Sequence, residues 1–329
     1  MGHKMKQMMK AGVALLLVAV LALAAAGCGK KDSAKEYHIG VMQPMEHPSL
    51  DLVYKGFQAG LKEQGYGDKV ELDFQNAQGD QSTMNTIAQR FISQKKDLIL
   101  CIATPAAQAV AAQTKDTPII GAAITSFTAA GLVKSDEHPG GNVTGVSDMA
   151  PVDAQVALIT DLLPQAKTVG FLYNSGEANS VVQVGKIKAA VKAKGLKTTE
   201  QTVMNSNDVQ QAVQALVKKC DVMYSPTDNT IASTMPTVIQ AANEAKTPII
   251  VGADSMVDDG GLATAGVDYT ELGKRAATMA IKILKGAKPA DIPVEVMTKD
   301  YHVVINKKEA DLFGITIPDT YKDAKLVGE

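Results

Sequence analysis

Polar side chains that could recognise a small molecule stand directly after short apolar, β-type segments of this 329-residue chain. In parallel α/β sheets, ligands bind outside the carboxyl ends of the strands, so the residues that follow these segments are the candidates for a site. Two groups are expected to face each other: Gln43, His47, Ser49, Leu50, Thr104, Ala106 and Thr125 from the first half of the chain, and Asn174, Ser175, Asn179, Ser180, Asp228, Asn229 and Asp254 from the second.

The residue types in these groups suit a zwitterionic ligand. Thr104, Ser180 and Asn229 stand just ahead of predicted helices, whose unpaired N–H groups and positive dipole ends favour an anion such as a carboxylate. Asp228 or Asp254 could pair with an ammonium group. Ordinary helix capping explains any one such residue by itself. We interpret the set as a site because its members converge on one predicted cleft.

No catalytic or metal-binding pattern accompanies these residues. His47 adjoins Glu46, as in an acid–base pair, but no nucleophile motif accompanies them, so we interpret His47 as a loop contact. The five histidines are scattered and lack a His-Glu-x-x-His motif, and no Gly-x-x-x-x-Gly-Lys-Ser/Thr loop is present. We therefore expect no catalytic residue, no metal and no cofactor. Five methionines near the predicted cleft could pack on an apolar ligand or simply fill the core: Met42, Met45, Met149, Met223 and Met256.

The elements that must position these residues alternate between short apolar segments and longer amphipathic ones. This alternation is typical of parallel sheets with crossover helices. The predicted strands cover residues 38–42, 70–74, 98–102 and 118–122 in a first set, and 168–173, 198–203, 222–224 and 248–252 in a second.

The two sets follow one plan. The segment 97–100, Asp-Leu-Ile-Leu, corresponds to 221–224, Asp-Val-Met-Tyr, and 117–120, Thr-Pro-Ile-Ile, is repeated at 247–250. The sequence therefore predicts an α/β fold of two similar doubly wound parallel-sheet lobes.

Three extended passages are predicted to cross between the lobes and form a three-segment hinge. The first, residues 140–146, is rich in glycine and β-branched residues, and the others lie at 262–269 and 294–305. We expect an N-terminal lobe of residues 36–146 plus 264–297 and a C-terminal lobe of residues 147–263 plus 298–329.

The N-terminal residues have the features of an export signal. Lys4, Lys6 and Lys10 precede an apolar run from Ala11 to Ala26, which is shorter than the roughly 20 residues of a membrane-spanning helix. Cys28 follows Ala-Ala-Gly, as in the lipobox of bacterial lipoproteins, although Ala25 stands where leucine is usual. We expect a signal peptide over 1–27, lipidation at Cys28 and a polar tether over 28–35.

Charge and cysteine content narrow the possible partners. Without residues 1–27 the chain has 30 basic and 35 acidic residues, a balance of −5, so nucleic acid is not an expected partner. The remaining cysteines, Cys101 and Cys220, lie in or beside β-like segments and are interpreted as small core residues.

Four stretches resemble the tryptophan-binding-protein-like family of ABC substrate-binding lipoproteins. They are residues 40–51, 103–108, 139–148 and 228–233, in order along nearly the whole mature chain. The resemblance implies a type I periplasmic-binding-protein-like fold that closes on its ligand by hinge motion.

The resemblance also implies an aromatic or other apolar amino acid as ligand. Thr104 and residues 174–180 would meet its polar end, with Asp228 and Asn229 opposite. Ser126-Phe127 stands where relatives tend to have Asp-Pro, which leaves the exact ligand open. The chain has no tryptophan, the ring on which sugar-binding relatives commonly stack their ligands, and this disfavours a sugar.

The leading hypothesis is a monomeric, non-enzymatic receptor, anchored by Cys28 to the outer face of the cytoplasmic membrane or the periplasmic side of a membrane. It would deliver an amino acid, with the aromatic Trp, Phe or Tyr expected, to an ABC permease with its ATPase subunit. The alternatives are a ligand-sensing receptor and an ABC binding protein for another small molecule, such as a sugar or a nucleoside. An exported hydrolase is disfavoured because no catalytic constellation is visible.

Overall fold

The computed structural model describes residues 2, 36–297 and 300–328. The predicted signal peptide, the tether and Cys28 lie outside this range, except for Gly2. The chain divides into two compact units, residues 1–35 and 36–329, and the second unit contains the whole fold described below. Within the described residues, no helix is both long and apolar enough to span a membrane.

The first lobe is built on a six-stranded sheet in which every strand pair is parallel. The strand order β2-β1-β3-β4-β5 is that of a doubly wound sheet, and β11 extends it at the β5 edge. The strands are β1 (Tyr37–Gln43), β2 (Val70–Asn76), β3 (Leu98–Ile102), β4 (Ile119–Ala122), β5 (Val143–Ser147) and β11 (Glu295–Val296).

The second lobe repeats this plan, which confirms the two similar lobes predicted from the sequence. Its order β7-β6-β8-β9-β10 matches that of the first sheet, and β12, antiparallel to β10, and β13 complete the far edge. The strands are β6 (Thr168–Asn174), β7 (Lys197–Val203), β8 (Val222–Ser225), β9 (Ile249–Val251), β10 (Ala263–Val267), β12 (Tyr301–Asn306) and β13 (Lys325–Val327).

Helices cover both faces of each sheet, because successive side chains of a buried strand point to opposite faces. In β3, Leu98 and Leu100 pack with the helices on one face and Ile99 and Cys101 with those on the other. The first pair of helices is α2 (Pro48–Glu63) and α11 (Tyr269–Leu284), and the second is α3 (Gln81–Ser93) and α4 (Thr104–Ala111).

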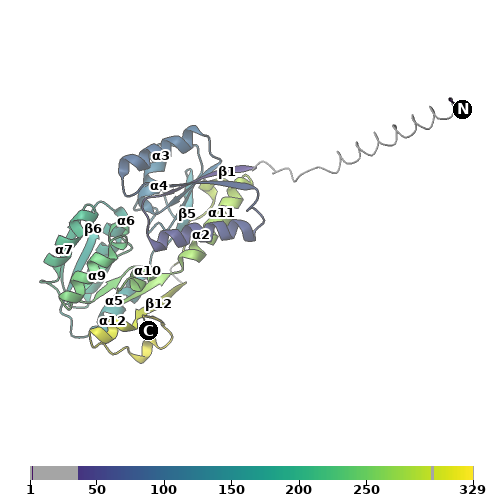
Figure 1. Ribbon diagram of the computed structural model, residues 1–329. Coiled ribbons are helices and arrows are strands. Elements are labelled where there is room, and N and C mark those ends of the chain that lie inside the picture. The colour runs from purple at the N-terminus through teal and green to yellow at the C-terminus, as the bar shows by residue number, and fades with distance from the viewer. Residues whose placement is uncertain (1, 3–35, 298–299, 329) are drawn as a thin grey trace. The chain divides into compact units, whose positions relative to one another are not determined.

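The second sheet is covered in the same way (Figure 1). One face carries α7 (Val209–Leu216) and α9 (Met235–Glu244), and the other α5 (Val152–Leu162) and α6 (Ala178–Ala193). The remaining helices are the short α8 (Asn229–Ala232), α10 (Asp254–Asp258) and α12 (Lys307–Leu312), with single 3₁₀ turns at Ser206–Asp208, Pro289–Asp291 and Asp319–Tyr321.

The crossings between the lobes differ in position from the prediction. Residues 140–146 were expected to cross, but Val143–Ser147 forms β5 within the first sheet, so the crossing begins after Ser147. The strand Ala263–Val267 pairs with β9 and β12, which places residues 264–267 in the second lobe rather than the first. The third crossing lies between β11 and β12 and includes residues 298–299, which are not described.

A close helix crossing fixes one wall of the cleft. A Cβ atom added to Gly56 of α2 would lie 2.1 Å from the Thr270 carbonyl oxygen, and one added to Gly273 of α11 would lie 2.1 Å from that of Val53. Only glycine permits this approach of two backbones. The close packing of α2 on α11 holds residues 47–50, at the start of α2, beside Tyr269, at the start of α11.

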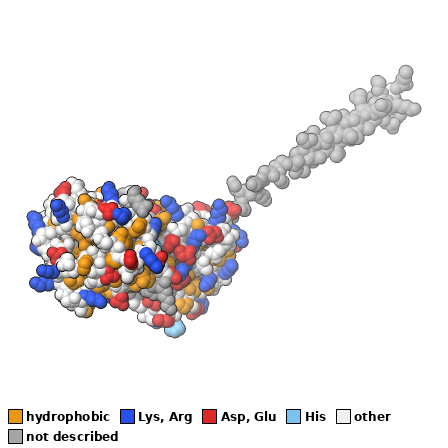
Figure 2. Space-filling model, turned by 90° about the horizontal axis from the view of Figure 1, so that it is seen from below, with side chains coloured by type: hydrophobic (Ala, Val, Ile, Leu, Met, Phe, Trp, Pro, Cys, Tyr) orange, Lys and Arg blue, Asp and Glu red, His pale blue; other side chains and the backbone are white. Residues whose placement is uncertain are grey.

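The surface in Figure 2 carries acidic and basic side chains interspersed with apolar ones. On this face the structure offers no continuous basic field of the kind that phosphate backbones require.

Candidate functional site

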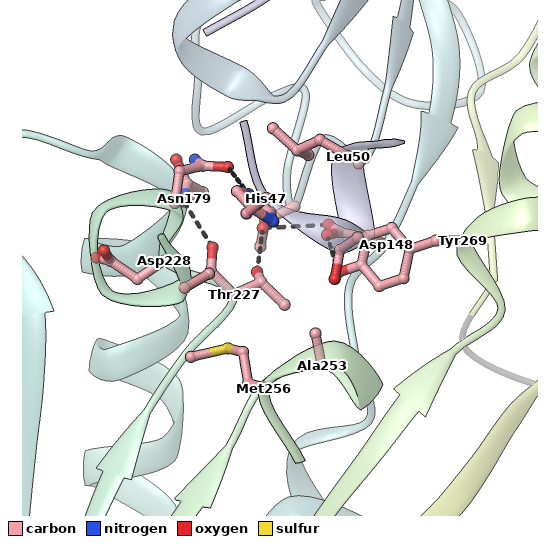
Figure 3. Close-up of a pocket in the computed structure, with 14 residues that line it drawn as sticks. His47, Leu50, Asp148, Asn179, Thr227, Asp228, Ala253, Met256 and Tyr269 are labelled. Carbon is pink, nitrogen blue, oxygen red and sulfur yellow. Dashed lines mark hydrogen bonds between the residues drawn. The ribbon is translucent and has the colours of Figure 1, made fainter. Parts of the chain in front are cut away.

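A cavity between the two lobes is enclosed by residues from both (Figure 3). Its empty volume is about 340 Å³, of which about 20 Å³ admits the centre of a water molecule. The space is therefore narrow, with room for about one water molecule. It is lined by His47, Ser49, Leu50, Ala123, Thr125, Asp148, Asn179, Thr227, Asp228, Asn229, Ala232, Ala253, Met256 and Tyr269.

The fold brings these residues together because the strands of both sheets end at the cleft. The start of α2 follows β1, and the segment with Ala123 and Thr125 follows β4. From the second lobe, residues 227–229 follow β8, and residues 253–256 follow β9. This is the arrangement expected for doubly wound sheets.

Asp148 is the acidic centre of the cavity. Its Oδ1 accepts a hydrogen bond from the Thr125 hydroxyl (3.2 Å) and its Oδ2 one from the Tyr269 hydroxyl (3.1 Å). Burial raises the pKa of Asp148 to about 6, and these two bonds only partly oppose that rise. No lysine or arginine is among the described residues that line the cavity, so this carboxylate has no cationic partner there.

Gln183 of α6 links the lobes beside Asp148. Its amide nitrogen donates to the Thr125 hydroxyl in the first lobe (2.8 Å) and to the Thr227 hydroxyl in the second. The two threonine hydroxyls lie 3.4 Å apart across the cleft. A third interlobe contact joins Ser49 Oγ of α2 to Ser255 Oγ of α10, 2.6 Å apart.

A second polar chain starts at Glu177. This buried carboxylate accepts hydrogen bonds from the Asn229 side-chain nitrogen (2.5 Å), the Asn229 backbone N–H (3.1 Å) and the Asn179 side-chain nitrogen (3.0 Å). Because the amide nitrogen of Asn229 is turned to Glu177, its Oδ1 faces His47 Nε2 at 3.1 Å, across the cleft.

The tautomer of His47 follows from this chain. An amide oxygen only accepts hydrogen bonds, so Nε2 carries the proton. Burial lowers the pKa of His47, which keeps the ring neutral and leaves Nδ1 as a bare acceptor. Among the described residues, neither this Nδ1 nor Oδ1 of Asn179 has a hydrogen-bond partner, and both atoms are buried.

Asp228 has a structural role in the second lobe. Its Oδ1 caps α8 by accepting from the Ile231 N–H (2.9 Å), and its Oδ2 accepts from the Asn174 N–H (2.6 Å) and the Ser180 hydroxyl (2.6 Å). Burial, followed by the nearby charge of Glu177, raises the pKa of Asp228. These three bonds occupy the carboxylate, so it lines the cavity while binding its own lobe.

The apolar part of the cavity consists of one large side chain from each lobe and three small ones. Leu50 and Met256 supply the large groups, and the small residues Ala123, Ala232 and Ala253 leave space between them. Small side chains at these positions create a slot that a planar group could enter once the lobes part.

Seven of the predicted residues line this cavity: His47, Ser49, Leu50, Thr125, Asn179, Asp228 and Asn229. The other seven do not. Gln43 donates to Asp51 and the Met45 carbonyl within the first lobe, and Ala106 is fully buried in the core around α3 and α4. Thr104 is buried at the start of α4, outside the lining.

The remaining four predicted residues make contacts within the second lobe. Asn174 donates to the Thr230 hydroxyl and lines a separate outer groove. Ser175 bonds the Met204 sulfur, Ser180 donates to Asp228, and Asp254 lies 2.5 Å from His302 Nε2. These partners lie in neighbouring strands, loops and the helix α8, so these side chains bind their own lobe although they follow strand ends.

Asp148 and Tyr269 are lining residues that the sequence analysis missed. Both follow the last strand of their lobe's repeat, β5 and β10, and the prediction considered only the ends of β1, β3, β4 and their counterparts. The repeat itself contained the missing signal, since Ser147-Asp148 and Val267-Asp268-Tyr269 stand at corresponding strand ends. Thr227 and the three alanines were also missed.

A wider groove lies beside Asn229. Both lobes line it, through Met45, Gln78 and Pro105 on one side and Met204 and Ser206 on the other. Asn229 borders both this groove and the inner cavity. In the part of the chain that is described, no group of three or more His, Cys, Asp or Glu residues could hold a metal ion.

Comparison with known proteins supports a single family. The family model described as ABC transporter substrate binding protein matches residues 38–325. A tyrosine-binding protein of Clostridioides difficile (strain R20291) is 46% identical over 280 residues, which cover 84% of this chain and 81% of that protein.

Two solved structures bear on the state of the lobes. An ABC domain in complex with L-Trp from Streptococcus pneumonia has a TM-score of 0.87 at 46% identity and covers 89% of this chain and 100% of its own. A ligand-free, open substrate-binding protein from Clostridium difficile has a TM-score of 0.68 at 42% identity and covers 88% and 99%. The chain therefore superimposes better on the L-Trp complex than on the ligand-free, open protein.

Proposed function

The chain belongs to the family of ABC transporter substrate-binding proteins, and we propose that it binds an aromatic amino acid, L-Tyr or L-Trp, between its lobes without chemical turnover. The observation that carries the proposal is the buried Asp148 carboxylate in a cleft that has an apolar slot and no lysine or arginine among its described lining residues. The similarity to a tyrosine-binding protein and to an L-Trp complex supports the same ligand class.

The ammonium group of the ligand would bind at Asp148. A carboxylate buried away from water is stabilised when an opposite charge lies within hydrogen-bond distance, and an ammonium group supplies both charge and donors. Thr125 and Tyr269 hold the carboxylate in place by donating one hydrogen bond to each oxygen.

The ring of the ligand would occupy the slot between Leu50 and Met256. The alanines Ala123, Ala232 and Ala253 provide flat, apolar walls, and transfer of an aromatic ring from water to such walls is favourable. The carboxylate of the ligand would meet hydroxyl groups, those of Thr227 and of the Ser49–Ser255 pair.

Binding requires the lobes to open first. The closed cavity has room for about one water molecule, so an aromatic amino acid would enter an open cleft, and closure would reform the interlobe contacts around it. The contacts to be broken include Ser49–Ser255, His47–Asn229 and Gln183–Thr125.

The cellular context follows from the family and from the N-terminal sequence. We expect the protein to deliver its ligand to an ABC permease with its ATPase subunit, as an extracytoplasmic monomer anchored through lipidated Cys28. Residues 1 and 3–35, which include this cysteine, lie outside the described structure.

Calorimetric titration of residues 36–329 with the twenty amino acids tests the proposal. We expect one-to-one binding of L-Tyr or L-Trp and an increase in the unfolding temperature with ligand concentration. Binding confined to sugars or nucleosides would contradict it, and so would consumption of the ligand during incubation.

A further inference from the structure

Two buried hydrogen-bond acceptors of the cavity have no donor. Several buried side-chain atoms lack a hydrogen-bond partner within the described residues, and two of them belong to residues that line the cavity, His47 Nδ1 and Asn179 Oδ1. The residues His47 and Asn179 are 6% and 5% exposed. A buried acceptor without a donor costs free energy, so a ligand that brings a donor to this place would be favoured.

The neighbours of both side chains fix these two atoms as acceptors. His47 Nε2 faces the side-chain oxygen of Asn229 and carries the proton, and burial lowers the pKa of His47, so Nδ1 keeps a free lone pair. The amide nitrogen of Asn179 donates to Glu177 Oε2 (3.0 Å) and to the backbone carbonyl of Thr227 (3.0 Å). Because a backbone carbonyl only accepts, this orientation of the amide is fixed, and Oδ1 is the atom left without a partner.

The amino-acid end of the ligand is bound elsewhere in the cavity. Under the proposed function its ammonium group lies at Asp148, and its carboxylate meets hydroxyl groups that include the Ser49–Ser255 pair, beside the first N–H groups of α2, which have no acceptor within the helix. Figure 3 shows Asn179 on the opposite side of the cavity from Asp148 and Tyr269. The two free acceptors are therefore available to the other end of the ligand, its ring.

The edge of an aromatic ring either carries a hydrogen-bond donor or does not. L-Tyr has a phenol O–H and L-Trp an indole N–H, whereas L-Phe has neither. The slot between Leu50 and Met256 offers apolar contact to all three rings. Closure of the lobes around a phenyl ring would exclude water and leave both acceptors without a donor, and a site of this kind rejects the ligand that lacks the donor.

We infer that His47 Nδ1 and Asn179 Oδ1 recognise a hydrogen-bond donor on the edge of the ligand's aromatic ring, so that the protein binds L-Tyr and L-Trp and discriminates against L-Phe. The inference rests on the proposed function, because it uses the same cleft and the same slot for the ring. It narrows the ligand class from aromatic amino acids to those whose ring carries an O–H or N–H group.

Ligand pairs of nearly equal shape test the inference. Calorimetric titrations of residues 36–329 would compare L-Tyr with 4-fluoro-L-phenylalanine, in which fluorine replaces the hydroxyl group, and with L-Phe. L-Trp would be compared with 3-benzothienyl-L-alanine, in which sulfur replaces the indole N–H. We expect each ligand without a ring donor to bind at least about 100-fold more weakly than its donor-bearing counterpart.

The outcomes separate this inference from the proposed function. A smaller difference in either pair would overturn the inference, while binding of these amino acids between the lobes would leave the proposed function in place. Absence of binding by all five amino acids would overturn both.

A substitution at His47 checks which atom recognises the ring. In H47Q the amide nitrogen of glutamine can replace Nε2 as the donor to Asn229, but no acceptor takes the place of Nδ1. We expect the affinity for L-Tyr to fall at least about tenfold and that for 4-fluoro-L-phenylalanine to change little, so that the ratio of the two dissociation constants decreases. A purely structural role of His47 would weaken both ligands equally.

H38Q is the matched control, because His38 is exposed near the other end of β1. The ratio of the two dissociation constants should be the same in H38Q as in the unaltered chain. An unchanged ratio in H47Q would contradict the assignment to His47. If H47Q did not fold, the ligand pairs with the unaltered chain would still decide the inference.

Discussion

The hydroxyl of Tyr269 donates a 3.1 Å hydrogen bond to Asp148 Oδ2, and this contact joins two of the three crossings between the lobes. Asp148 directly follows β5, where the chain leaves the first lobe, and Tyr269 begins α11 just after the chain returns from β10. The residue proposed to bind the ligand's ammonium group is therefore part of the hinge. Neutralising its charge would act on the segments that move during closure.

Ligand affinity should depend on pH through Asp148. Burial raises the pKa of Asp148 to about 6, so the carboxylate becomes protonated as the pH falls below that value and loses its attraction for an ammonium group. We expect the dissociation constant to increase about tenfold between pH 7 and pH 5. Calorimetry at constant ionic strength measures it, and a pH-independent affinity over this range would exclude Asp148 as the ammonium partner.

Tyr269→Phe should shift that pH profile. The variant removes one of the two donors that stabilise the ionised carboxylate, so the pKa of Asp148 should rise further and the loss of affinity should begin at a higher pH. His47 and Asp228 also face the cavity, but neither exchanges a hydrogen bond with Tyr269 in the structure. If Y269F and the unaltered chain had the same pH profile, His47 or Asp228, and not Asp148, would be the group whose protonation changes the affinity.

Asp148 and Asp228 should respond differently to the same change. D148N removes an ionised carboxylate whose raised pKa corresponds to a burial cost of the order of 2–3 kcal/mol at pH 7, so the unliganded protein should be as stable or more stable. D228N replaces one carboxylate oxygen of Asp228 with an NH₂ group, which cannot accept a hydrogen bond. Because Oδ1 accepts one hydrogen bond and Oδ2 accepts two, at least one donor loses its partner, and the free energy of unfolding should fall by about 1–3 kcal/mol.

Urea denaturation and ligand titration of both variants separate the two roles. The expected pattern is lost binding with retained stability for D148N, and reduced stability with ligand binding largely kept for D228N. The reverse pattern would restore Asp228 as the ammonium partner that the sequence suggested.

Filling the slot should exclude the ring. Ala253→Leu adds three carbon atoms to the wall between the lobes, and we expect affinity for L-Tyr and L-Trp to fall by more than about tenfold because the ring and the new side chain would compete for one space. Ala253→Ser, which adds one atom, serves as the control. Circular dichroism checks the fold, and equal affinity in both variants would place the ring elsewhere.

Gly145 should be intolerant of any side chain. Its φ is +154°, and a Cβ atom there would lie 1.9 Å from the Gly121 carbonyl oxygen on the neighbouring strand β4. We expect G145A to lose more than about 3 kcal/mol of unfolding free energy. At Gly141 nothing lies within 4 Å of an added Cβ atom, so G141A is the control, and comparable stability of the two variants would contradict the strand pairing.

The sequence by itself determined the repeated α/β plan and much of one side of the site. The two sets of apolar segments begin with matching Asp and Thr-Pro residues, and this repeat predicted two sheets built on the same plan. The prediction was possible because the spacing of apolar residues and the residue types of turns are local properties of the chain. The strand ends then located His47, Ser49, Leu50 and Asn229, since the loops after parallel strands all lie at one edge of the sheet.

Tertiary structure decided which of the polar residues face the ligand and which hold the lobe together. Asp228 and Asp148 are both acids after a buried strand, and the sequence favoured the first. Only the packed structure turns both oxygens of Asp228 to its own lobe, and leaves Asp148 buried with two hydroxyl donors and no lysine or arginine among the described residues of the cavity. The physical reason is that a hydrogen-bond partner is a property of three-dimensional distance: Asp148 and Tyr269 are 121 positions apart in the chain, and no local pattern brings them together.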